Sequence, residues 1–139
     1  MSNFNYRAGM HSVGQYQMSA IPYVSASLAV PALGTAPLEI TFPRVSRFVT
    51  VRNTLATTAT AVPFRVGFSS IGASGSVAGK NNYFTLANGE SYTGEWRIKS
   101  IYLLSDSTTP SSASITAGLT AVSTSSLGFD NWSGSLGVG

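Results

Sequence analysis

Two glutamates in this sequence are of a residue type that could support catalysis. Glu90 and Glu95 could supply the two carboxyl groups that glycoside hydrolysis needs, roughly 5–9 Å apart. They are five residues apart on a predicted strand, and because strand side chains alternate, this odd separation directs them to opposite faces. Glu95 is instead placed two residues from Arg97 on one strand face, which is the pattern of a surface charge pair. We therefore expect no carboxylate catalysis.

Two glycine-containing stretches partly match loops that hold nucleophiles or phosphates. A nucleophile elbow needs glycine two residues after its serine, but Ser76 follows Ser74 at that distance. A Walker loop around Gly79-Lys80 needs glycine five residues before that pair and serine or threonine after it, whereas Ser74 and Asn81 occupy those places. The composition of residues 70–81 indicates a long loop instead.

Ligands for a metal ion are scarce. The chain has no cysteine, which excludes a disulfide framework, a thiolate zinc site and a cysteine nucleophile. Its single histidine, His11, has no histidine or aspartate at ligand spacing. Asp106, Asp130 and Asn131 could ligate calcium, but they do not form the Asp-x-Asp-x-Asp run of a calcium loop. We expect that the protein binds no metal ion and no cofactor and that it is not an enzyme.

The composition favours a structural or binding protein. The 139 residues fit one domain, and 43% of them are hydrophobic, so the chain can build a core. Only 9% are charged, against roughly 25% in an average domain. Serine (22) and threonine (14) supply the polarity that charges usually supply.

The net charge of +3 divides unevenly along the chain. Residues 1–69 carry five arginines against Glu39, which is +4, and residues 70–139 carry three cations against four acids, which is −1. No cluster of Lys and Arg stands out along the sequence, so direct contact with nucleic acid is not expected. The simplest interpretation is that the arginines pair with glutamates or with a neighbouring subunit.

Alternation of apolar and polar residues indicates the fold. From Tyr23 to Leu119 the period is two, which predicts about eight short strands with turn signals such as Asn88-Gly89 between them. One of them runs through Tyr92, Gly94, Trp96 and Ile98, which alternate with polar residues. Residues 101–104 are apolar on both faces, which predicts a central strand covered on both sides. We predict no helix of useful length, no internal repeat, no membrane span and no signal peptide. The expected fold class is all-β, an eight-stranded antiparallel sandwich or a closed barrel, with eight strands typical of a single jelly roll.

We divide the chain into an N-terminal arm (1–22), a β-sandwich domain (23–122) and a Gly/Ser-rich C-terminal arm (123–139). Both arms carry aromatic residues, among them Tyr6, Tyr16, Phe129 and Trp132, which is unusual for solvated tails. Trp132 is either a plug into its own domain or an anchor into a partner.

Several segments together resemble a protein family. They are Leu38-Glu-Ile-Thr-Phe-Pro43, Arg47-Phe-Val-Thr-Val-Arg-Asn53, Phe64-Arg-Val-Gly-Phe68, Gly89-Glu-Ser-Tyr-Thr-Gly-Glu-Trp96, Ile101-Tyr-Leu-Leu-Ser-Asp106 and Asn131-Trp-Ser-Gly134. In strand pattern and composition the chain resembles the single jelly-roll structural proteins of double-stranded DNA viruses. That resemblance implies a non-enzymatic vertex (penton), minor capsid or decoration protein. Its partners would be copies of itself and the major capsid protein. It would be made in the host cytoplasm and located in the virion.

Assembly would then be the function. We expect a homo-oligomer, a pentamer first and a trimer as the alternative, with Tyr6, Tyr16, Phe129 and Trp132 as anchors and Arg44, Arg47 and Arg52 as orienting contacts. The alternative is a carbohydrate-binding β-sandwich module or fibre-head lectin. In that case Tyr83, Tyr102 and Trp132 would cluster on the surface and stack on sugar rings.

Overall fold

The domain consists of two four-stranded antiparallel sheets. The structure, a computed structural model, describes residues 20–54, 62–127 and 132–139. Two short helices accompany the strands, α2 (Ser70–Ser74) and η1 (Thr124–Leu127). The strands are β1 (Ile21–Val30), β2 (Leu38–Thr41), β3 (Ser46–Asn53), β4 (Phe64–Gly67), β5 (Tyr83–Leu86), β6 (Ser91–Gly94), β7 (Ser100–Ser105) and β8 (Ser111–Leu119).

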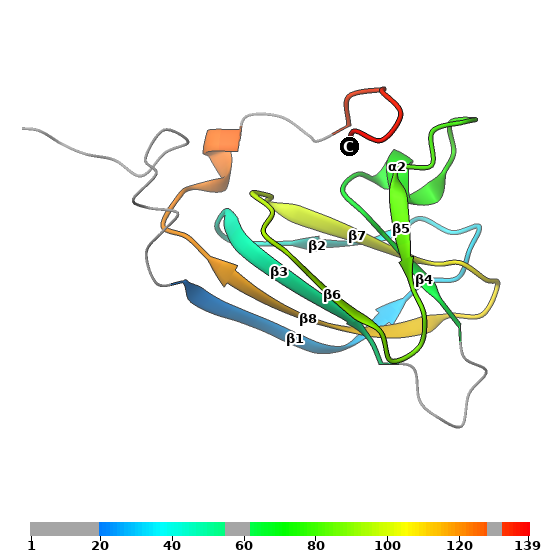
Figure 1. Cartoon of the computed structure of the whole chain (residues 1–139), viewed down its shortest axis with the longest axis horizontal. Coiled ribbons are helices and arrows are strands. Elements are labelled where there is room, and N and C mark those ends of the chain that lie inside the picture. Colours follow the sequence, from blue (N-terminus) through cyan, green and yellow to red (C-terminus); the bar gives the residue numbers. More distant parts are fainter. Residues whose placement is uncertain (1–19, 55–61, 128–131) are drawn as a thin grey trace, which may run out of the picture.

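The strand pairing is nested, and this nesting defines the fold. The first strand pairs with the last (β1 with β8), and the pairs β2 with β7, β3 with β6 and β4 with β5 follow inward. The two sheets have the orders β1-β8-β3-β6 and β2-β7-β4-β5, and they face each other (Figure 1). The predicted antiparallel β-sandwich is confirmed, and its strand order is that of a jelly roll.

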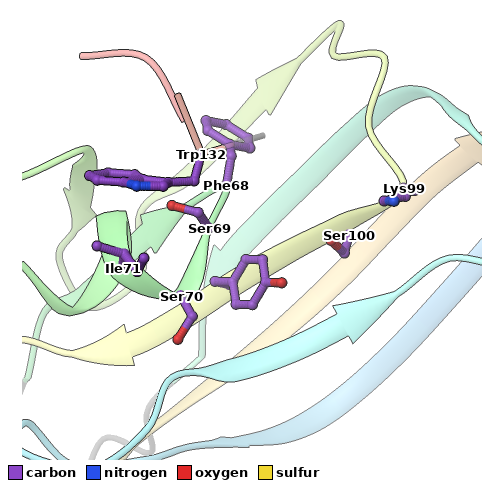
Figure 2. A pocket seen from close by; sticks show the side chains of 8 residues that line it. Phe68, Ser69, Ser70, Ile71, Lys99, Ser100 and Trp132 are labelled. Atoms are coloured by element: carbon purple, nitrogen blue, oxygen red, sulfur yellow. The ribbon is translucent and has the colours of Figure 1, made fainter. Parts of the chain in front are cut away.

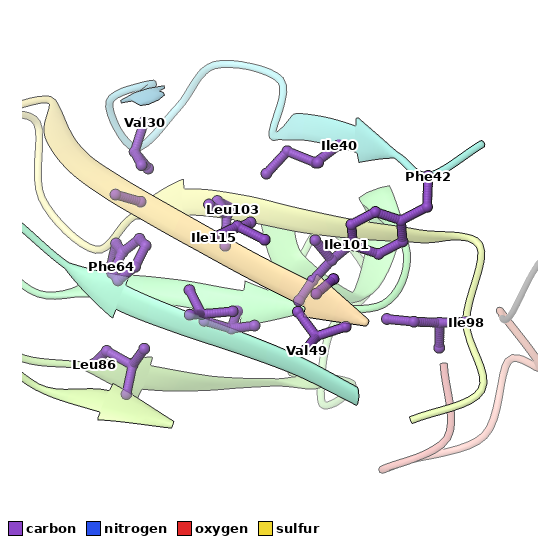
Figure 3. Close-up of a cluster of buried hydrophobic side chains, with 14 of the residues drawn as sticks. Val30, Ile40, Phe42, Val49, Phe64, Leu86, Ile98, Ile101, Leu103 and Ile115 are labelled. Atoms are coloured by element: carbon purple, nitrogen blue, oxygen red, sulfur yellow. The ribbon is translucent and has the colours of Figure 1, made fainter. Parts of the chain in front are cut away.

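Alternation along each strand creates the core between the sheets. On β3, Val49 and Val51 are fully buried and point inward, whereas Thr50 and Arg52 point to the outer face. Residues from both sheets meet in one apolar cluster (Figure 3). Its largest fully buried members include Phe42, Phe64, Ile101, Leu103 and Ile115. The prediction that 101–104 forms a central, covered strand is confirmed, because β7 lies between β2 and β4 with Ile101, Leu103 and Leu104 buried.

The sequence-based expectation for the sixth strand is wrong at its end. Alternation predicts a strand from Tyr92 to Ile98, but β6 ends at Gly94. The ring of Trp96 turns back over Gly94 and occupies the space that a Cβ would need there. The following residues bond to Ser46 instead, whose backbone N–H donates to the Ile98 carbonyl at 2.9 Å.

The predicted loop over residues 70–81 contains a helix that the sequence analysis missed. Ser69 caps α2 by accepting from the Gly72 N–H at 2.9 Å. Gly75 ends it in the left-handed conformation with φ of 66°, which glycine adopts without strain. Ala73 packs directly on Gly67 of β4, where a larger residue would collide with it. The helix therefore lies on the outer face of the β2-β7-β4-β5 sheet.

A buried amide joins the two sheets at one edge. Asn53, at the end of β3, is fully buried, and its Nδ2 donates to the carbonyls of Val62 at 2.9 Å and Leu86 at 3.0 Å. Both acceptors belong to the β4 and β5 side of the sandwich. Removing the donor leaves buried acceptors without their partner, which costs about 1–3 kcal/mol for each.

We predict that Asn53→Ala lowers the free energy of unfolding by about 2–3 kcal/mol. Chemical denaturation followed by far-UV circular dichroism measures the change. The control is Asn81→Ala, an exposed position, which should stay within about 0.5 kcal/mol of the wild type. Equal stability of the two variants would show that the amide does not join the sheets.

Candidate functional site

One face of the sandwich is broad and nearly uncharged. It is the outer face of the β1-β8-β3-β6 sheet, which we call the hydroxyl face. Its register places Val24, Thr116, Thr50 and Thr93 in one row across all four strands. Arg52 is its one charged member. The face consists of Pro22, Val24, Ala29, Phe48, Thr50, Arg52, Ser91, Thr93, Ser112, Ser114, Thr116 and Gly118.

The hydroxyl groups of this face hold one another in place. Thr50 and Thr93 share a hydrogen bond of 2.8 Å across neighbouring strands. At one margin the Phe48 ring lies on Gly118 and beside Ala20, in space that a Cβ at position 118 would fill. Val24 remains 70% exposed. The result is a smooth surface with apolar and hydroxyl groups and little charge to desolvate on contact.

The edge of the same sheet is a second available surface. β1 has ten residues, none of them charged, and pairs only with β8 within the described chain. A register shift between Ser25 and Leu28 bends it, and Ser27 adopts a positive φ of 56°. A long edge strand without charged residues can accept another strand, because its outward backbone groups are unpaired within the sheet.

The opposite sheet is covered by α2, which Arg65 fixes in place. Its Nε donates to Asp106 Oδ1 at 2.7 Å, and its Nη1 donates to the carbonyls of Ala73 and Ser74 at the end of the helix. The guanidinium also lies 4.2 Å from the centre of the Tyr83 ring. With its side chain only 13% exposed, Arg65 is a structural clamp.

The C-terminal segment 132–139 folds back on this covered side (Figure 1). The buried Asn82 side chain makes three hydrogen bonds to this segment. The Asn82 Nδ2 donates to the carbonyls of Ser135 at 3.0 Å and Val138 at 3.2 Å, and its Oδ1 accepts from the Gly137 N–H at 2.7 Å. Lys80 donates to the Gly134 carbonyl. One side chain thus binds three backbone groups of the segment.

Trp132 borders a small hollow beside α2 (Figure 2). The hollow has a volume of about 130 Å³, and its lining includes Ser70, Lys99, Tyr102 and Trp132. Trp132 is half-buried and faces α2, so it contacts its own domain, and its role as an anchor into a partner stays a prediction. Tyr102 lies in the same hollow, but Tyr83 lies under Arg65 and does not line it.

Of the residues predicted as subunit contacts, those that the structure describes lie on different surfaces. Tyr6, Tyr16 and Phe129 lie outside the described residues. Arg52 is exposed on the hydroxyl face, whereas Arg44 and Arg47 are exposed near the turn between β2 and β3. Trp132 lies on the other side, against α2. The three arginines and Trp132 are therefore distributed over three surfaces.

The two glutamates that were considered for catalysis, Glu90 and Glu95, lie on either side of β6. The Glu90 carboxylate accepts from the Ala87 N–H at 2.9 Å and closes the turn before β6, whereas Glu95 is exposed beyond the end of that strand. In the part of the chain that the structure describes, no three His, Cys, Asp or Glu side chains gather as metal ligands. Within the same residues, no helix has the length and apolar character to cross a membrane.

Sequence reasoning missed the two residues with the most specific side-chain contacts, Arg65 and Asn82. Arg65 occupies an ordinary polar position of an alternating strand, and its partners come from residues 73, 74 and 106. Asn82 follows a Gly/Ser loop, and its partners are more than 50 residues away. The only local pattern that could have pointed to Asn82 is an asparagine directly before a strand. Many loops contain an asparagine at such a position, so the pattern does not identify this residue.

Comparison with known proteins adds no relative: no protein-family model and no curated protein matches this chain.

Asn82→Ala should release the C-terminal segment while leaving the sandwich folded. Three hydrogen bonds to one buried amide are lost, so we expect the Gly137 amide hydrogen to exchange at least roughly tenfold faster. Hydrogen–deuterium exchange with mass spectrometry measures this. Asn81→Ala, the exposed neighbour, is the matched control and should leave the exchange unchanged. Equal exchange in both variants would contradict the role of Asn82.

Proposed function

We propose that this chain is a non-enzymatic virion structural protein that assembles with itself and docks on a capsid shell, as a vertex (penton) or a minor capsid or decoration subunit. The observation that carries the proposal is the hydroxyl face on a jelly roll: twelve positions across four strands with one charged side chain, Arg52. Jelly rolls serve in viral capsids and in lectins, so the fold alone is compatible with either.

The chemistry of the hydroxyl face suits a protein partner. Charged residues are depleted at the centres of protein interfaces, because burying an unpaired charge is costly. Hydroxyl groups can exchange water for a partner's backbone groups, and exposed Val24 adds apolar area. With 9% charged residues, the chain also has little charge repulsion to keep copies apart.

The β1 edge offers a way to align two such faces. Strand addition at this edge would extend the β1-β8-β3-β6 sheet into a neighbouring copy or into a strand of the shell protein. Ile21 and Val24, which are 59% and 70% exposed, would gain burial at such a junction. The arm 1–19 precedes Ala20, which lies with Phe48 next to Gly118 at the margin of the hydroxyl face. Tyr6 and Tyr16 of this arm would then reach the neighbour as anchors.

Carbohydrate binding is the alternative function. Tyr102 and Trp132 line one hollow together with serine hydroxyls, which favours it. Two observations count against it. The hollow of about 130 Å³ is small beside ligand pockets of roughly 300–1,000 Å³, and Tyr83 packs under Arg65 instead of joining the other two rings.

We predict that Thr116→Asp, a charge at the centre of the hydroxyl face, abolishes self-association. Burying an unpaired carboxylate in an interface costs several kcal/mol, which is more than a single new contact at that position can contribute to the binding free energy. Native mass spectrometry of the full chain measures the oligomer. The matched control is Thr85→Asp, an exposed threonine on a strand of the other sheet, which should assemble normally.

A pentamer in the wild type would support a vertex protein, and a trimer would support a decoration or spike protein. A wild-type monomer at all concentrations would contradict self-assembly. If that monomer also bound a glycan array in a manner lost on Trp132→Ala, carbohydrate binding would replace assembly as the function.

Deletion of residues 1–19 should also abolish the oligomer, because the arm supplies the anchors Tyr6 and Tyr16. The isolated domain should keep its far-UV circular dichroism spectrum and melt cooperatively, since all eight strands of the described residues begin after residue 20. Tyr6→Ser/Tyr16→Ser in the full chain keeps the arm length and should reproduce the loss. Oligomers of wild-type size from the deletion variant would show that the arm is not required.

A further inference from the structure

Two turns at one end of the sandwich are held side by side. Residues 42–45 connect β2 to β3, which begins at Ser46, and residues 95–99 connect β6 to β7. The Phe42 N–H donates to the Lys99 carbonyl at 2.8 Å, and the Ser46 N–H donates to the Ile98 carbonyl at 2.9 Å. The Ser46 hydroxyl also donates to the Trp96 carbonyl. These bonds bring together parts of the chain that are about 50 residues apart.

Cationic side chains gather on these two turns. Arg44 and Arg47 come from the first turn and the start of β3, and Arg97 and Lys99 come from the second. We call these four residues the basic end. With Glu95 its charge is 4 − 1 = +3, which equals the formal net charge of the whole chain. The remaining four cations and four acids of the sequence cancel, so the four cations of the basic end and Glu95 together account for the net charge.

The side chains of the basic end can reach a ligand. Arg44, Arg47 and Arg97 are exposed, and three arginines provide the planar donors that match phosphate oxygens. Lys99 is half-buried and borders the hollow lined by Tyr102 and Trp132 (Figure 2). Within this hollow Tyr102 donates to Glu39 at 3.1 Å, so Trp132 is the ring that remains for stacking on an unpaired base.

We propose that the basic end binds the phosphodiester backbone of nucleic acid, with single strands preferred over duplex. The absence of a basic cluster along the sequence argues against such contact, but the cluster forms only when the two turns meet. All four cations belong to one chain, so binding requires no assembly. This inference therefore goes beyond the proposed structural function and can fail or succeed without it.

The experiment measures binding of the full chain to fluorescent oligonucleotides of mixed sequence, single-stranded and duplex, by anisotropy. Four phosphate contacts predict a slope of log affinity against log salt of about −3 for single strands between roughly 50 and 200 mM salt. Arg97→Gln should weaken binding roughly three- to tenfold at the lower salt and reduce the slope by about 0.7. Arg44→Gln/Arg97→Gln should reduce the slope by about 1.4.

The matched control is Arg52→Gln. It removes the same exposed residue type and the same unit of charge, but Arg52 lies five residues along β3 from Arg47, about 17 Å away. Binding should therefore persist in Arg52→Gln. The proposal is overturned if the wild type binds neither oligonucleotide, if Arg52→Gln loses as much as Arg97→Gln, or if polyglutamate binds as tightly as the oligonucleotides. Loss confined to the basic-end variants supports it, whatever oligomer the chain forms.

Discussion

The rest of this structure depends on burial of the two inner sheet faces against each other. Neither sheet can exist alone in water with Val49, Ile101 or Ile115 exposed, and together they enclose one apolar cluster. Because strand side chains alternate, burying one face of each sheet leaves the other face outside. The two outer faces are thus the only broad surfaces that the described strands can offer, and they differ. One carries hydroxyl groups, and the other carries α2 and the C-terminal segment.

Buried polar side chains at the two ends of β3 add hydrogen bonds to the packing of the apolar core. Asn53 binds two carbonyls across the sandwich at one end, and Ser46 binds the turn after β6 at the other. Both side chains are fully buried, so their hydrogen bonds are protected from competition with water. The same interactions place the functional surfaces. Ser46 holds the two turns that form the basic end, and the stretch of β3 between Ser46 and Asn53 contributes Phe48, Thr50 and Arg52 to the hydroxyl face.

The two proposed functions use different surfaces of the molecule, the hydroxyl face for assembly and the basic end for nucleic acid. An uncharged sheet face suits contact with copies of the chain or with a shell protein, since little charge must be desolvated. A concentrated basic end suits a polyanion, since the attraction reaches beyond contact distance at low salt. On the covered sheet, Asn82 and Lys80 hold the segment that carries Trp132. Residues that look alike in the sequence, such as Arg47, Arg52 and Arg65, thereby acquire different roles.

The strands and the fold class could be predicted from the amino-acid sequence, because alternation of apolar and polar residues is a local property of each strand. The sequence also predicted β7 as a central strand, from apolar residues on both faces of 101–104. It failed where a residue's place depends on distant partners. β6 stops at Gly94 because the Trp96 ring packs on that glycine, and α2 is too short for a helical period and is held by Arg65. The contacts of Asn82 with the C-terminal segment, and the position of four scattered cations at one end, became visible only in the folded domain. The physical reason is that hydrogen bonds between turns about 50 residues apart bring these groups together, and no local pattern records such a contact.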